Sequence, residues 1–331
     1  MNFSQSEKKA LLGLLRNPSA DGKELAGSID MSYWNLMKIK KKLVERGILR
    51  FIWVPDFRSL GAEIVFSGHG TVRRDEKAPD VSSDLLFFTA VEERKGFGIG
   101  LSSNYEQFYD EFMAFSDKYG YLRAENFGMT VLPVRKADIW RLADFYPLLS
   151  QDFGLSAPSL GSKGKKSEKI CLKEGEKEIL SAIIEHPEWS GERIGNEIGV
   201  SRQRVLRMRE RFEYEGIIER KAVVDLKKMG YEVLLFVTWT MRPSIYRKMY
   251  ENINKYPLSP IILGISTPMQ GMAIAAFRSF RRSREIVERL SKWANPDENL
   301  IGEPEVVFLS VQDSVFPKYF SFSDLIKNIL K

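Results

Sequence analysis

The feature that most constrains this chain is an internal repeat, because a sequence that matches itself in one register must form the same architecture twice. Residues 7–63 align without a gap with residues 176–232, at a constant offset of 169 residues. The matched positions are mostly apolar or turn-forming: Leu11 and Leu180, Pro18 and Pro187, Ser32 and Ser201, Gly47 and Gly216, Asp56 and Asp225, Gly61 and Gly230. The 331-residue chain is therefore expected to hold two copies of one unit, each long enough for its own core.

A stretch without periodicity separates the two copies. Residues 154–169 are rich in Gly, Ser and Lys, which is the composition of a flexible, solvated linker. We therefore expect five segments: a winged helix-turn-helix over 1–60, an α/β domain over 61–153, a linker over 154–170, a second winged helix-turn-helix over 171–229 and a second α/β domain over 230–331.

The second copy begins with a pattern typical of three helices. Apolar residues at helical spacing predict helices over residues 177–185 and 191–198. Ser201 is a good N-cap for a third helix that runs to about Tyr214. Two β-rich runs follow, at 217–224 and 231–241, and we expect them to form a short hairpin. Three helices and a hairpin make a winged helix-turn-helix, in which the third helix enters the major groove of DNA.

The remainder of each copy predicts strands and helices in the order β-α-β-β-α-β, which is the ferredoxin-like arrangement, followed by one more helix. The last helices are expected near Ala137–Leu149 and Ser321–Leu330. In the first copy the segment 73–83 is charged and contains Pro79, so its first helix is expected to be short or missing. The predicted fold class is α+β, with tandem winged helix-turn-helix and ferredoxin-like domains, duplicated. The two ferredoxin-like domains are expected to pack sheet to sheet.

The predicted third helix of the second copy carries long hydrogen-bonding side chains on its outer face. Arginine can form two hydrogen bonds to guanine and glutamine can form two to adenine, and arginine also binds phosphate. The candidate DNA-contacting residues of this copy are Ser201, Arg202, Gln203, Arg204, Arg207 and Arg211. A solvated charged helix face is the alternative interpretation.

The first copy has the same predicted helix-turn-helix pattern, but its third helix carries different side chains. Its aromatic residues are expected to contact thymine methyl groups or sugars, or else to pack against another domain. The candidate DNA-contacting residues of this copy are Ser32, Tyr33, Trp34, Asn35, Lys38 and Lys41.

Composition narrows the remaining possibilities. The net charge is +6 and the isoelectric point is near 9.1, which fits a polyanionic partner such as DNA. Cys171 is the single cysteine and His69 and His186 are the two histidines, so we expect no disulfide within the chain, no metal site and no cofactor. No apolar run approaches the roughly 20 residues of a membrane-spanning helix. The N-terminal residues do not read as a secretion signal, and the chain is expected to be cytoplasmic.

A winged helix that leads into a β-α-β-β-α-β domain resembles the Lrp/AsnC family of bacterial and archaeal transcription regulators. The resemblance rests on residues 176–231, above all Ser201, Phe212, Gly216, Asp225 and Gly230. It implies a chain that binds double-stranded DNA as a fused pseudo-dimer, with homo-oligomers possible through the α/β domains.

The same resemblance implies a small-molecule effector near the turn between the second and third strands of each domain. The matching turns are Glu92–Phe97 and Thr267–Met272, and they keep Gly96 and Gly271 as candidate effector-binding residues. Neither turn has the Asp that is typical of the family there. An amino-acid effector would therefore lack its usual carboxylate partner.

The leading hypothesis is a sequence-specific transcription regulator without enzymatic activity. The alternative is an enzyme such as a siroheme decarboxylase, since these resemble Lrp/AsnC proteins in fold, can occur as fused pairs and use a histidine-bearing segment of the α/β domain. His69 is the one histidine of the predicted α/β domains, and it is expected at the edge of the first strand. A third hypothesis is an interaction protein whose winged helices bind protein.

Overall fold

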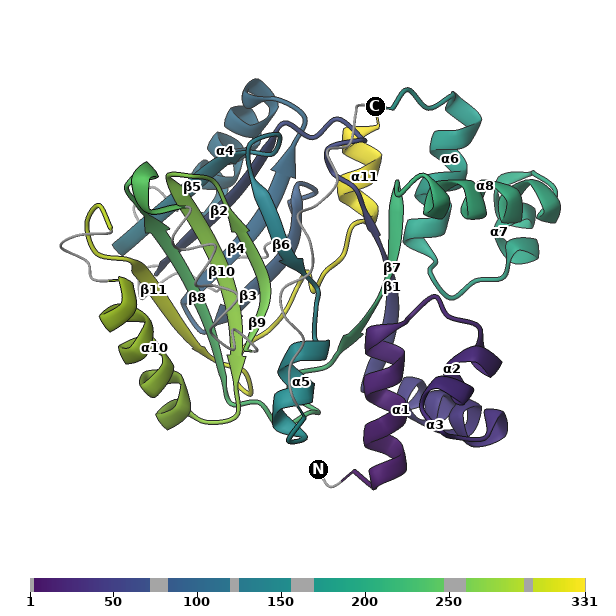
Figure 1. The fold of residues 1–331 in the computed structure, drawn as a ribbon. Helices are drawn as coiled ribbons and strands as arrows, with labels where there is room; N and C mark the ends of the chain where they lie inside the picture. The colour runs from purple at the N-terminus through teal and green to yellow at the C-terminus, as the bar shows by residue number, and fades with distance from the viewer. Residues whose placement is uncertain are drawn as a thin grey trace. The chain divides into compact units, whose positions relative to one another are not determined.

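The computed structural model describes residues 3–71, 83–119, 125–155, 170–246, 260–294 and 300–330 (Figure 1). The helices are α1 (Gln5–Arg16), α2 (Gly22–Ser28), α3 (Tyr33–Glu45), α4 (Tyr105–Tyr119), α5 (Tyr146–Asp152), α6 (Glu174–Glu185), α7 (Gly191–Ile198), α8 (Arg202–Tyr214), the 3-10 helix η2 (Pro243–Ile245), α10 (Phe280–Ala294) and α11 (Ser323–Ile329). The strands are β1 (Leu49–Pro55), β2 (Ile64–Thr71), β3 (Leu86–Glu92), β4 (Lys95–Ser102), β5 (Glu125–Pro133), β6 (Asp138–Leu142), β7 (Ile218–Val224), β8 (Val233–Thr240), β9 (Ile261–Ser266), β10 (Gln270–Phe277) and β11 (Glu305–Ser310). Across the described residues, every helix is too short or too polar to cross a membrane. The predicted irregular segment 73–83 lies almost entirely outside the described residues.

Both copies form the predicted helix-turn-helix at the predicted offset. Helices α1 and α6 have 12 residues each, and α3 and α8 have 13 each. The first residues of α1 and α6 are separated by 169 positions (174 − 5), as are those of α3 and α8 (202 − 33). Gly199 ends α7 in the left-handed conformation, with φ of 71°, which glycine adopts without a steric penalty. The prediction of three helices in each copy is confirmed.

The strand that follows each helix-turn-helix does not form the predicted hairpin. Strands β1 and β7, one from each copy, pair as a two-stranded sheet. The N–H of Asp56 donates to the carbonyl of Ile217 at 2.8 Å, and the N–H of Asp225 donates to the carbonyl of Ile48 at 2.9 Å. Strand β8, expected to complete the hairpin, pairs with β10 and β11 instead. Both edges of β8 are thereby occupied, which leaves β7 to pair with its counterpart β1.

The described chain forms two compact units, and each is assembled from segments far apart in sequence. Unit 1 comprises residues 1–50, 137–164 and 221–314, and unit 2 comprises residues 51–136, 165–220 and 315–331. Each unit therefore combines the helix-turn-helix of one copy with the ferredoxin-like sheet of the other, and each holds part of the β1–β7 pair.

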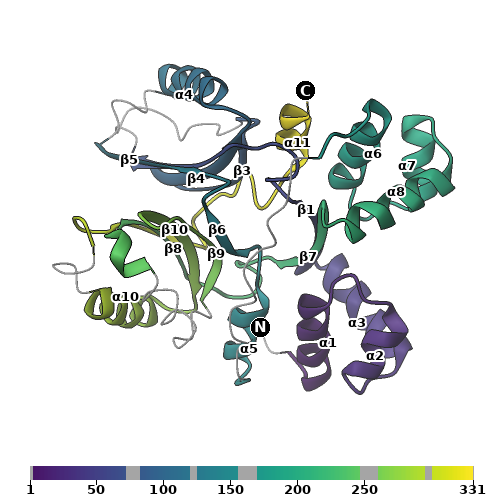
Figure 2. The ribbon, with the colours of Figure 1, turned by 45° about the horizontal axis from the view of Figure 1, so that its top comes forward.

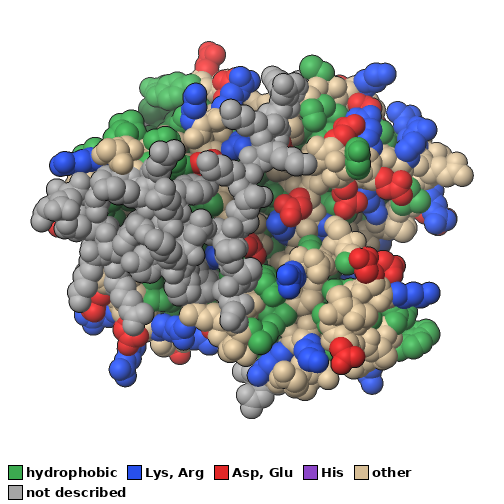
Figure 3. Space-filling model, in the orientation of Figure 1, with side chains coloured by type: hydrophobic (Ala, Val, Ile, Leu, Met, Phe, Trp, Pro, Cys, Tyr) green, Lys and Arg blue, Asp and Glu red, His purple; other side chains and the backbone are tan. Residues whose placement is uncertain are grey.

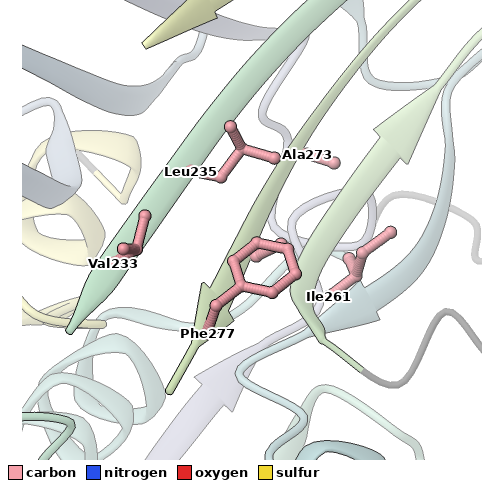
Figure 4. Close-up of a cluster of buried hydrophobic side chains, with 6 residues drawn as sticks. Val233, Leu235, Ile261, Ala273 and Phe277 are labelled. Carbon is pink, nitrogen blue, oxygen red and sulfur yellow. The ribbon is translucent and has the colours of Figure 1, made fainter. Parts of the chain in front are cut away.

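The sheet of unit 1 has the strand order β11-β8-β10-β9-β6, and all neighbouring strands are antiparallel. Its first four strands have the order expected of a ferredoxin-like domain, with the first and third strands in the centre. Helix α10 covers one face (Figures 1 and 2). The buried side chains on that face come from β8, β9 and β10 (Figure 4): Val233, Leu235, Ile261, Ala273, Ala275 and Phe277.

The fifth strand of this sheet corrects a prediction. Residues 137–149 were expected to form one helix, but Asp138–Leu142 form strand β6 and the helix α5 begins only at Tyr146. Strand β6 pairs with β9, more than a hundred residues later in sequence. The prediction of a helix relied on the spacing of apolar residues within this segment, and that spacing carries no information about so distant a pairing partner. The other predicted terminal helix is confirmed as α11.

Unit 2 repeats this plan. Its sheet has the order β3-β4-β2-β5, and α4 packs against β4. The segment 315–321 runs beside β3, where the N–H of Val91 donates to the carbonyl of Val315 at 3.0 Å and the N–H of Thr89 donates to that of Lys318 at 2.7 Å. Phe322 then packs against Phe87 with ring centroids 5.3 Å apart. The C-terminal part of each copy thus pairs with the sheet of the other copy: β6 in unit 1, and residues 315–321 in unit 2.

One ion pair recurs in both helix-turn-helices and joins the third helix to the first. Glu7 and Lys42 lie 2.6 Å apart in the first copy, and Glu176 and Arg211 lie 2.7 Å apart at the equivalent positions of the second. The hydrogen bond from Arg211 holds the pKa of Glu176 below its ordinary value, and the backbone N–H of Lys173 acts in the same direction. Lys42 and the backbone of Ser4 lower the pKa of Glu7 in the same way.

A lowered carboxyl pKa makes this contact depend on pH. Its stabilisation is complete above the ordinary glutamate pKa of about 4.3 and is lost as the pH falls through the lowered pKa. We expect Glu176→Gln to reduce the free energy of unfolding by about 1 kcal/mol at neutral pH, and the difference from the wild type to shrink in acid. Denaturant unfolding at neutral pH and at about pH 3 measures both values.

Glu174→Gln is the matched control, because Glu174 lies on the same helix and its side chain is 89% exposed. It should change the free energy of unfolding little at either pH. If Glu176→Gln reduces the free energy of unfolding by the same amount in acid as at neutral pH, then the shape of the side chain, and not its charge, stabilises the contact.

Candidate functional site

The third helices begin with the predicted caps. The hydroxyl oxygen of Ser32 accepts from the N–H of Asn35 at 3.3 Å, and that of Ser201 accepts from the N–H of Arg204 at the same distance. These bonds satisfy a backbone donor at each helix start. Ser32 and Ser201 therefore have a structural role whether or not they also contact DNA.

Helix α8 presents a basic outer face. Val205, Met208 and Phe212 are buried on its inner side. The four predicted contact residues that it carries outward are all exposed: Arg202, Gln203, Arg204 and Arg207. Figure 3 shows Lys and Arg side chains along the outer edge of the α6–α8 helices. The structure thus brings these four residues together on one solvent-facing surface.

Arg211, the last predicted contact residue of this copy, is held within the helix-turn-helix. Besides its bond to Glu176, its Nε lies 3.4 Å from the carboxylate of Glu215. A guanidinium that already has two carboxylate partners is less available to a phosphate. A DNA contact by Arg211 stays a prediction.

Helix α3 offers a surface of a different kind. Trp34 is 82% exposed, which is unusual for so large an apolar side chain. Its ring meets that of Tyr33 edge to face, with centroids 5.8 Å apart. Lys38 is exposed, and Lys41 lies 3.7 Å from Glu45 one turn along the helix. With the exposed Asn35, these residues form an aromatic and basic face on α3.

The two predicted effector glycines have packing roles. A Cβ on Gly96 would lie 2.7 Å from the carbonyl oxygen of Ala90, and one on Gly271 would lie 2.3 Å from the Trp239 ring. Both positions therefore require glycine for their own sheet. Effector contacts at Gly96 and Gly271 stay predictions.

His69 lies on the first strand of its ferredoxin-like domain, as expected, two residues from the end of β2. This strand is a central strand of the unit 2 sheet, and His69 is only 6% exposed. It lies directly opposite Phe97 on β4 and Gly128 on β5. Ser67 and Thr130, which pair with each other, are buried on the same face. A polar group of three side chains thus lies on a largely apolar sheet face. Strand alternation contains the signal for this placement, because Ser67, His69 and Thr71 share one side of β2.

A cation lies at the end of the same face. Lys95 is opposite Thr71, two residues beyond the His69–Phe97 pair, and its Nζ is 3.2 Å from a carboxylate oxygen of Glu92. Arg94 precedes it in the β3–β4 turn and is half-buried. This face therefore offers an imidazole and, towards its outer end, positive charge that attracts carboxylates.

The equivalent face of unit 1 has different chemistry. The position of His69 is occupied by Thr238, at the offset of the repeat (238 − 69 = 169). Thr238 lies opposite Met272 and Glu305, and its hydroxyl donates to the Glu305 carboxylate at 3.2 Å. Gln270 stands where unit 2 has Lys95. Among the described residues, the imidazole is thus found on the face of unit 2 alone.

The described residues contain no group of three or more His, Cys, Asp or Glu side chains placed to hold a metal ion. The candidate surfaces are therefore the outer faces of α3 and α8 and the His69 face of the unit 2 sheet.

No protein-family model matches the chain, and no curated protein matches it. Solved structures do. Siroheme decarboxylase NirDL in complex with an iron-uroporphyrin III analogue matches over 98% of this chain and 99% of its own, with a TM-score of 0.56 and 15% sequence identity. NirDL alone matches over 98% of both chains, with a TM-score of 0.53 and 14% identity. AsnC from E. coli matches over 42% of this chain and 93% of its own, with a TM-score of 0.34 and 16% identity.

The two end-to-end matches contradict the prediction that the chain is not an enzyme, because both are structures of an enzyme. The sequence favoured a regulator because His69 is the one histidine of the predicted α/β domains and the turns Glu92–Phe97 and Thr267–Met272 carry none. The α+β fold class is confirmed. Along nearly its whole length, the chain has the fold of siroheme decarboxylase NirDL.

Proposed function

We propose that this chain is an enzyme that binds a carboxylated tetrapyrrole and removes carboxyl groups from it as CO₂. The observation that carries the proposal is the match to siroheme decarboxylase NirDL across 98% of the chain, with a TM-score of 0.56. Because the match spans 99% of the enzyme's own chain, it supports the same kind of activity here.

The His69 face is the candidate reaction site. In a decarboxylation the bond between carbon and the carboxylate breaks, CO₂ leaves, and the electron pair that stays on carbon takes up a proton. Histidine is the side chain best suited to supply that proton near neutral pH. His69 is buried among apolar residues such as Phe97, which suit the flat face of a tetrapyrrole. Lys95 and Arg94 can bind the carboxylates that remain on the substrate.

Access is part of the proposal. Because His69 is only 6% exposed, a tetrapyrrole reaches it only after the residues that cover this face move. Exclusion of water afterwards favours decarboxylation, because a carboxylate that has lost its hydration gives up CO₂ more readily.

The two histidines of the chain provide a matched pair of variants. We expect His69→Asn to lower kcat for decarboxylation of siroheme by about 100-fold or more, the usual contribution of a positioned proton donor. Tetrapyrrole binding, followed by its visible absorbance, should persist in this variant. His186→Asn should leave turnover unchanged, because His186 ends α6 and stacks on Trp189, 3.6 Å between ring centroids. Full activity in His69→Asn would refute the role of His69, and a wild-type chain that does not consume a bound tetrapyrrole would refute the activity.

We also propose that the helix-turn-helices bind double-stranded DNA. The observation that favours this second function is the outer face of α8, where Arg202, Arg204 and Arg207 are exposed beside Gln203. Arginine and glutamine at these positions match the donor and acceptor pattern of base edges, while the lysines of α3 suit phosphates. Binding of this kind becomes weaker as salt rises, because each phosphate contact releases a counterion.

Substitutions separate the two kinds of contact. Arg204→Ala and Arg207→Ala should each cost about 1–3 kcal/mol and relax the preference at one base pair. Lys41→Ala should weaken binding to all sequences alike. Binding-site selection and gel shifts at rising salt measure these effects. A sequence preference lost in Lys41→Ala but kept in both arginine variants would assign base reading to α3, and the absence of duplex binding at low salt would reject the function.

A further inference from the structure

Unit 1 contains a groove that takes no part in the functions proposed above. It lies between α1, the end of α2 and the segment from α5 to Leu155, and its volume is about 680 Å³. Helices α1 and α5 lie side by side in both ribbon views (Figures 1 and 2). The residues of this α1–α5 groove that carry the argument are Lys8, Lys9, Arg16, Asp30, Tyr146 and Phe153.

Three cations of α1 line the groove without a carboxylate partner. Lys8 and Lys9 lie in the second turn of α1 and Arg16 at its end, and none of the three forms an ion pair within 4.0 Å in the part of the chain that the structure describes. The Nζ of Lys8 is 5.3 Å from the centroid of Phe153, and the Cζ of Arg16 is 5.7 Å from that of Tyr146. The two aromatic rings therefore position positive charge along an apolar wall.

The second copy of the fold shows the same helix contact with two of these three cations replaced by carboxylates. In unit 2, α11 packs against α6 as α5 packs against α1. The positions of Lys9 and Arg16 are occupied there by Glu178 and Glu185 (each 169 residues later). Glu185 forms an ion pair with Lys327 of α11 at 2.7 Å. The fold thus accepts either sign of charge at these positions, so the cations of unit 1 are not required for folding.

We propose that the α1–α5 groove binds a small organic anion, in which an aromatic body packs on Tyr146 and Phe153 and one carboxylate or sulfonate contacts Lys9 and Arg16. A volume of about 680 Å³ lies within the usual range for small-molecule sites, roughly 300–1,000 Å³. A guanidinium and an ammonium together give an anion charge-assisted hydrogen bonds. Asp30 lines the same groove and repels a second negative group, which favours a singly charged ligand over a phosphate chain.

Two fluorescent probes that share an aromatic body test the proposal: anilinonaphthalene sulfonate, which carries one negative charge, and N-phenylnaphthylamine, which carries none. We expect the wild-type chain to bind the charged probe more tightly. The double substitution Lys9→Glu with Arg16→Glu introduces the side chains of the second copy and should weaken binding of the charged probe at least about tenfold. Binding of the uncharged probe should change little.

Lys23→Glu is the matched control, since Lys23 is an exposed cation of α2 in the same unit and does not line the groove. It should leave binding of both probes unchanged. Lys9→Gln with Arg16→Gln removes the two charges without reversing them. This variant replaces the double glutamate variant in the test if circular dichroism shows that the latter does not fold. Equal affinity of the charged probe for the wild type and the folded double variant would overturn the proposal, as would equal affinity of the two probes for the wild type.

Discussion

Backbone pairing between segments far apart in sequence holds this structure together. Strand β6 follows the first sheet along the chain, yet it pairs with β9 of the second. Residues 315–321 pair in turn with β3 of the first sheet. Each pairing covers a strand edge whose backbone groups would otherwise stay unpaired. The helix that follows each added segment then packs on a helix-turn-helix, α5 on α1 and α11 on α6. These two pairings are the reason that each unit contains segments from both copies.

Local signals were sufficient to predict the helix-turn-helices. The apolar spacing, the serine caps and the stop at Gly199 all act within a few residues, and the structure reproduces them at the offset of the repeat. The exchanged elements could not be found in this way. Asp138–Leu142 has no periodicity that separates a strand from a helix, and its partner β9 is more than a hundred residues away. The pairing of β1 with β7 is non-local in the same sense.

His69 illustrates an inference that the sequence allowed but that was not drawn. The first strand of a ferredoxin-like sheet is a central strand, so a residue in the middle of β2 is enclosed on both sides. The structure buries His69 beside Phe97 of β4. The repeat adds information, because Thr238 occupies the same position in the other sheet. Two units with one architecture thus differ at this position, an imidazole in one and a hydroxyl bonded to Glu305 in the other.

We propose that the chain decarboxylates a tetrapyrrole and supplies the proton that replaces CO₂. Incubation of the purified chain with siroheme in heavy water, followed by mass spectrometry of the tetrapyrrole, tests this proposal. We expect a product that has lost CO₂ and has gained one non-exchangeable deuterium for each carboxyl group removed. A tetrapyrrole that binds to the chain but is recovered with its mass unchanged would contradict it.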